Sequence, residues 1–203
     1  DAAASGAILH QGKTLDAVLR TTLSGLDPVS ITVLRLAACL PPDEIPWAWL
    51  RTMAATLHPT ELGDESLSTQ AAWGCTRRLL LSRNLLTDSD IPGIVRMHRL
   101  VSEWLRADAA HPAADAVVLD HLVDVAESLH NGAATTAPEC SALASAIAAC
   151  VATDDSAAAR FNIPGLFYRL PHYVSDGRPL SLAQGVLRAA ASAAMADPGN
   201  RGA

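Results

Sequence analysis

A segment in the middle of the chain, residues 85–105, restricts the possible fold most strongly. It holds two short apolar runs, residues 85–87 and 94–97, on either side of a turn rich in Asp, Ser, Pro and Gly. Runs joined in this way predict a β-hairpin with a loop longer than two residues. His98 follows directly and begins an amphipathic helical pattern whose apolar face holds Leu100, Val101, Trp104 and Leu105.

The segments before this hairpin predict helices. Leu15 to Leu26 has helical spacing, and Asp27 with Pro28 marks the start of a second helix, because Asp is a favoured N-cap and Pro a favoured first residue. Pro46 is expected to begin a third helix, which carries Trp47 and Trp49.

Residues 58–65 are expected to form a loop. A longer helix then runs from Ser66 to Arg83 and feeds the hairpin. Its expected inward face consists of Leu67, Ala71, Cys75, Leu79 and Leu80.

Beyond the hairpin the chain again predicts helices, over residues 116–129, 141–151 and 180–195. His111 and Pro112 give the best domain boundary. We expect a lead-in over residues 1–13, one domain over residues 14–110 and a helical domain over residues 111–203.

Composition narrows the class of protein. Half of the 203 residues are apolar, yet no run reaches the roughly 18 apolar residues that a membrane span needs. A formal charge of −6 argues against broad non-specific binding of nucleic acid, which requires a basic surface. The four cysteines lack metal-ligand spacing and predict buried free thiols in a reducing cytoplasm: Cys39, Cys75, Cys140 and Cys150. The chain starts without Met and without a signal-peptide pattern, so we expect a fragment of a longer cytoplasmic protein.

Three landmarks resemble the winged-helix region of bacterial NB-ARC/STAND signalling NTPases with tetratricopeptide repeats. The most specific is residues 97–101, Met-His-Arg-Leu-Val, after the hairpin; the others are residues 26–46 and residues 170–173, Leu-Pro-His-Tyr. The resemblance implies a mainly α fold, with a winged-helix domain and one small β-hairpin followed by a tetratricopeptide-like helical domain.

The resemblance also implies a regulatory function. The histidine equivalent to His98 contacts the β-phosphate of ADP, and the winged helix thereby senses the nucleotide state of the upstream nucleotide-binding domain of the same protein. Exchange for ATP would release the module for homo-oligomerisation. Plant and animal members of that class often carry Asp at the position of Arg99, so the resemblance implies a role for His98 but not for Arg99. Its structural alternative is to cap its helix or pack against Trp104.

Neither a P-loop nor a catalytic constellation occurs in the chain, so we expect no enzyme activity from it and no cofactor of its own, with ADP or ATP bound elsewhere in the complete protein. Arg77, Arg78 and Arg96 are candidates for nucleic-acid or partner contact. Two alternative functions therefore stay open: a winged-helix DNA-binding transcriptional regulator, or a protein-interaction scaffold that does not respond to nucleotide. His121 with two nearby aspartates is too small a set to predict a metal site.

Overall fold

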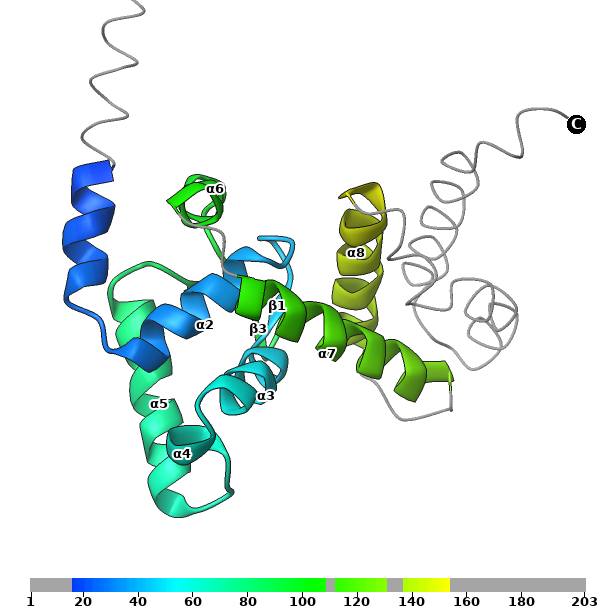
Figure 1. Cartoon of the computed structure of the whole chain (residues 1–203), viewed down its shortest axis with the longest axis horizontal. Coiled ribbons are helices and arrows are strands. Elements are labelled where there is room, and N and C mark those ends of the chain that lie inside the picture. The colour runs from blue at the N-terminus through cyan, green and yellow to red at the C-terminus, as the bar shows by residue number, and fades with distance from the viewer. Residues whose placement is uncertain (1–15, 109–111, 131–136, 154–203) are drawn as a thin grey trace, which may run out of the picture.

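The computed structural model describes residues 16–108, 112–130 and 137–153. This part is mainly helical with one small three-stranded antiparallel sheet, which confirms the predicted mainly α class. In Figure 1 the labelled strands lie near the middle of the described helices. After a helix over residues 16–24 come α2 (Pro28–Ala38), β1 (Ile45–Pro46), α3 (Trp47–Leu57), α4 (Pro59–Leu62), α5 (Leu67–Ser82), β2 (Thr87–Asp88), β3 (Ile94–Arg96), α6 (Arg99–Asp108), α7 (Pro112–His130) and α8 (Ala137–Thr153).

The start of α2 is set by local sequence, as predicted. Asp27 is the N-cap, and its carboxylate accepts hydrogen bonds from the Ser30 N–H at 2.9 Å and the Ser30 hydroxyl at 2.6 Å. These bonds use a main-chain donor that the first helical turn leaves without a partner. Burial of the carboxyl raises the pKa of Asp27, but its bonds to Ser30 outweigh this and leave the pKa below its ordinary value.

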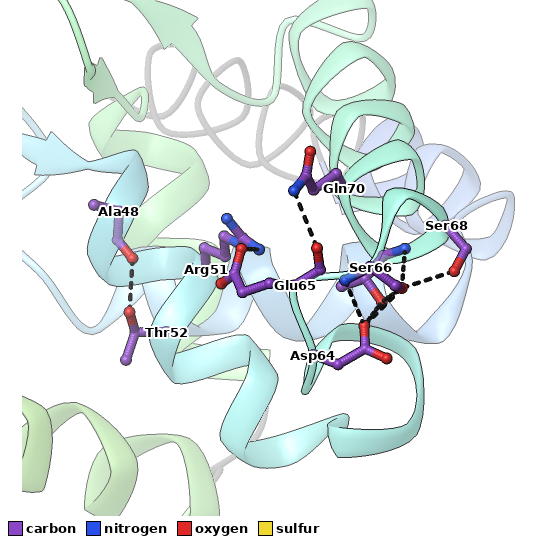
Figure 2. Close-up of polar contacts among 9 residues, drawn as sticks. Ala48, Arg51, Thr52, Asp64, Glu65, Ser66, Ser68 and Gln70 are labelled. Carbon is purple, nitrogen blue, oxygen red and sulfur yellow. Dashed lines mark hydrogen bonds and ion pairs between the residues drawn. The ribbon is translucent and has the colours of Figure 1, made fainter.

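The start of α5 also follows the predicted boundary. Ser66 caps the helix by accepting the Thr69 N–H at 3.3 Å, and Asp64 accepts the hydroxyls of Ser66 and Thr69 at 2.7 and 2.5 Å. Figure 2 shows Asp64 pointing toward Ser66, and Arg51 of α3 reaching Glu65 at 2.9 Å. The preceding segment, expected as a loop, contains the single helical turn α4.

The end of α5 is a Schellman motif. Asn84 adopts φ 52°, a left-handed conformation that Asn tolerates well, and its N–H bonds the Leu81 carbonyl at 3.0 Å. The Leu85 N–H bonds the Leu80 carbonyl at 3.1 Å, and both leucine side chains are buried. This motif turns the chain from α5 into the hairpin.

The predicted inward face of α5 is wrong at most of its positions. The buried residues are Thr69, Trp73, Thr76 and Leu80, whereas Leu67 is 84% exposed and Ala71 and Cys75 are exposed. Trp73 packs edge-on against Trp47 at 5.7 Å between ring centroids. Burying the Trp73 ring outweighs burying Leu67 with the small side chains of Ala71 and Cys75, so the helix turns Trp73 inward.

The predicted hairpin is present as β2 and β3, with a third strand that the sequence analysis missed. Strand β3 lies between β1 and β2, with Ile45 opposite Val95 and Thr87 opposite Arg96. Gly93 turns the hairpin with φ 83°. The missed strand β1 contains Pro46, which reads locally as a helix start and is tolerated because β1 is an edge strand.

Helix α6 begins where expected but buries a narrower face. Leu105 and Ser102 are buried, Val101 and Trp104 are half-buried, and Leu100 is 51% exposed. The predicted inward placement of Leu100 is therefore wrong. α6 packs on α2, which covers only the side of α6 that carries Ser102 and Leu105.

The helices after position 111 pack on the same core. α7 contacts α2 and α3, and α8 contacts α7 and β1. These two helices correspond to those predicted over residues 116–129 and 141–151, and both are somewhat longer than predicted. One cluster of buried apolar residues runs from Leu26 to Ile147. The domain division at residues 110 and 111 stays a prediction. The lead-in, residues 170–173 and the helix expected over residues 180–195 lie outside the described residues.

Candidate functional site

His98 lies between the sheet and α6, at a point where the chain changes from buried to exposed. The preceding Met97 is 2% exposed, and its N–H donates to the Pro42 carbonyl at 2.8 Å. His98 itself is exposed, and its carbonyl accepts the N–H groups of Val101 and Ser102 at 2.9 and 3.1 Å. The segment before β1 therefore anchors the residue before the histidine, and the helix anchors the residues after it.

The His98 ring also caps the helix. Its Nδ1 accepts the Leu100 N–H at 3.2 Å, which is the bond an N-cap side chain makes to the second helical residue. In a neutral imidazole an accepting Nδ1 leaves the proton on Nε2. The capping alternative from the sequence analysis thus holds, and it orients an N–H donor on the other side of the ring. An N–H donor at a helix start is chemically suited to an anion.

Helix α6 is held on the C-terminal end of α2. The Ser102 hydroxyl donates to the Ala38 carbonyl at 3.3 Å, Arg106 Nε donates to the same oxygen, and an Arg106 terminal nitrogen donates to Leu40 O at 3.1 Å. These bonds satisfy carbonyls that the end of α2 leaves without helical partners. The helix that begins after His98 is therefore tied to the end of α2.

Arg99, where the resemblance would place an acidic residue, forms an ion pair with Asp43 at 2.9 Å. The two side chains are 73% and 61% exposed, so the pair contributes little to stability. It joins the start of α6 to the segment before β1.

The other three predicted contact residues, all arginines, lie at two separate places on the protein. Arg77 and Arg78 line a surface depression on α5 together with Ala71, Gly74 and Leu81. Of these three, Ala71 was expected to face inward, and Gly74 and Leu81 were not predicted as contact residues. Arg96 lies on β3 and does not line it. The only sequence signal for this depression is a mid-helix glycine beside an arginine pair, on a helix without acidic residues.

His121 of α7 packs against Trp49 of α3, with 5.7 Å between ring centroids and an interplanar angle of 70°. Burial lowers its pKa, and the negative charges of Asp124 and Glu139 oppose that shift. No group of three or more His, Cys, Asp or Glu side chains in the described part of the chain is arranged to hold a metal ion.

The cysteines differ in exposure. Cys39 and Cys150 are half-buried, whereas Cys75 is exposed, so the predicted burial of Cys75 is wrong. The side chain of Cys140 lies outside the described set. Over the described ranges, no helix combines the length and apolarity that crossing a membrane requires.

The described residues thus define a mainly helical protein with a small antiparallel sheet and an exposed, ring-capped helix start. Comparison of the chain with known protein families, with curated proteins and with solved structures gives no match.

Proposed function

We propose that this chain is the regulatory winged-helix and helical region of a STAND-type signalling NTPase, and that His98 senses the nucleotide of an adjoining nucleotide-binding domain. The observation that carries the proposal is the His98 ring, exposed at the start of α6 with Nδ1 engaged by the Leu100 N–H. This arrangement leaves an Nε2–H donor for a phosphate oxygen.

The order of the elements supports the winged-helix part of the proposal. Helices α2, α3 and α5 precede the β2–β3 hairpin, and α6 follows it. α7 and α8 pack as neighbouring helices after α6, which is compatible with the start of a tetratricopeptide-like array.

The proposed mechanism is a shift between two conformations. With ADP bound, the His98 contact holds the module against the nucleotide domain; exchange for ATP removes the contact and frees surfaces for oligomerisation. A coupling free energy of roughly 1–3 kcal/mol suffices for such a response. The bonds from Ser102 and Arg106 to the end of α2 would make α6 and α2 move together.

DNA binding is the weaker alternative. The Arg77 guanidinium lies 4.8 Å from the centroid of the Trp47 ring, and Arg83 donates to the Thr22 carbonyl at 3.0 Å. Arginines held in this way are less available to phosphates, and the net charge of −6 opposes a polyanion.

The test uses the complete protein that carries this chain, after a P-loop has been sought within about 300 residues upstream, the reach of one or two domains. His98→Ser and His98→Asp retain an oxygen that caps the helix but remove the imidazole. We expect ADP affinity to fall about tenfold or more, as for loss of one hydrogen bond to a charged group, and further in the Asp variant, because a carboxylate repels phosphate.

Glu103→Ser, at an exposed position of the same helix, is the matched control and should leave ADP affinity unchanged. Thermal unfolding of each variant reports on the cap separately. Unchanged ADP affinity in both His98 variants, or a complete protein without a P-loop, would contradict the proposal.

A further inference from the structure

The exposed side of α5 carries a depression of about 520 Å³ lined by Ala71, Gly74, Arg77, Arg78 and Leu81. α5 runs along one edge of the described part in Figure 1. Its opposite side holds Trp73 and Leu80 in the core, so the depression lies on the face turned away from the protein interior.

Five residues on this face have the spacing of a helix-docking seam. Leu67, Ala71, Gly74, Arg78 and Leu81 follow one another at intervals of four, three, four and three residues. Such alternation keeps residues in line along a helix, and a second helix packs against them. Leu67 lies at one end of the seam and is 84% exposed, so a partner can reach it.

Gly74 indicates close approach by another backbone. It lies in the middle of α5, where glycine destabilises a helix relative to alanine. A Cβ at this position would meet no atom within 4 Å, so internal packing does not require a glycine. A partner helix crossing at Gly74 would supply the missing steric reason.

The charge of the face selects the partner. α5 contains Arg77 and Arg78 and no acidic residue. The Nε atom of Arg77 and the indole nitrogen of the neighbouring Trp47 are buried without a hydrogen-bond partner among the described residues. Carboxylates on an incoming chain would pair with the exposed Arg78 guanidinium as charge-assisted hydrogen bonds.

We propose that this face of α5 is a docking site for an acidic amphipathic helix of a partner protein. The partner's apolar side chains would cover Ala71, Gly74 and Leu81, and its carboxylates would reach Arg78. A second copy of α5 fits less well, because it would bring arginine against arginine. DNA also fits less well, because the floor of the depression is apolar. The proposal does not depend on nucleotide sensing by His98.

The probe is a fluorescein-labelled helical peptide of about 21 residues, with leucines at the seam spacing and flanking glutamates. We expect saturable binding by anisotropy, weakened when NaCl rises from about 50 to about 200 mM because salt screens the ion pairs. A peptide with lysine in place of glutamate should bind at least about tenfold more weakly, since like charges repel.

Two pairs of variants locate the site. Arg78→Glu should weaken binding at least about tenfold, whereas Arg96→Glu, an equal charge reversal on β3, should change it less than about twofold. Gly74→Leu should fill the depression and also weaken binding about tenfold, and Gly74→Ala should weaken it less, because one methyl group obstructs the crossing helix only in part. Both positions tolerate these changes, because Arg78 is exposed and Gly74 has open space.

The native thiol of Cys75 gives a second readout. It follows Gly74, is exposed, and lies 3.3 Å from an Arg78 nitrogen, so bound peptide should slow its alkylation. Three results would each overturn the proposal. The first is an equal effect of Arg78→Glu and Arg96→Glu, and the second is no protection of Cys75. The third is binding of a duplex of about 20 base pairs but not of the glutamate peptide.

Discussion

The side chain of Arg106 donates a hydrogen bond from Nε to the main-chain carbonyl of Ala38, so α6 caps the C-terminal end of α2. A second Arg106 nitrogen bonds the Leu40 carbonyl at 3.1 Å. A cation at this place also interacts favourably with the negative end of the helix dipole. Arg106, ten positions after the hairpin, thus caps a helix that lies about seventy positions earlier in the chain.

Replacing Arg106 with Ala should destabilise the protein. We expect the free energy of unfolding to fall by about 1–2 kcal/mol, because two carbonyls lose a charged donor. Urea unfolding monitored by circular dichroism measures the change. Arg99→Ala is the matched control on the same helix, and its exposed pair with Asp43 should contribute only about 0–1 kcal/mol. Equal losses in the two variants would show that the cap adds nothing.

The orientation of α5 can be tested by a pair of truncations. Trp73→Ala should lower the free energy of unfolding by about 3–5 kcal/mol, since it removes a buried ring that packs against Trp47. Leu67→Ala should change it by less than about 0.5 kcal/mol, because Leu67 is 84% exposed. A large loss for Leu67→Ala with a small loss for Trp73→Ala would mean that the helix faces the other way.

His121 should make stability depend on pH. Burial holds its pKa below the ordinary value of 6.5, so the unfolded chain binds a proton more readily than the folded protein. Stability is therefore complete above pH 6.5 and falls as the pH drops from 6.5 toward the lower pKa of the folded state. Urea midpoints between about pH 7.5 and pH 5 measure this decline.

The matched variant is His121→Phe, which keeps an aromatic ring against Trp49 but cannot take up a proton. Its stability should vary less over the same interval. The pKa values of Asp16, Asp27 and Asp64 are also lowered from their ordinary value of 3.8. These carboxyl groups therefore change the stability at more acid pH, outside this window. An unchanged pH dependence in His121→Phe would assign the effect to another group.

Cys39 and Cys75 should differ in reactivity. Burial, and then the nearby Asp115 carboxylate at 3.2 Å, raise the pKa of Cys39 to about 12. Only about one thiol in ten thousand is then a thiolate at pH 8, so iodoacetamide should modify the exposed Cys75 far faster. Peptide mass spectrometry distinguishes the two sites. Asp115→Asn should speed modification of Cys39; comparable rates at Cys39 and Cys75 in the unaltered protein would contradict the assignment.

Local signals made several elements predictable. The Asp27 cap and the start of α5 at Ser66 lie where the sequence places them, because each of these side chains bonds a main-chain N–H within three residues. The hairpin was predictable for the same reason, as its turn holds Gly93 in a conformation that favours glycine. The exposed position of His98, by contrast, depends on Met97 entering the core beside it.

The sequence by itself determined where α2 and α5 begin and that a hairpin precedes α6, since caps and turns depend on neighbouring residues. Only the tertiary structure decided which face of α5 is buried, because α5 carries apolar residues on both sides and packing of Trp73 against Trp47 selects one of them. It also decided that residues 45 and 46 pair with β3, and that Arg106 caps α2. Those contacts join residues about fifty to seventy positions apart, and no local pattern encodes such a distance.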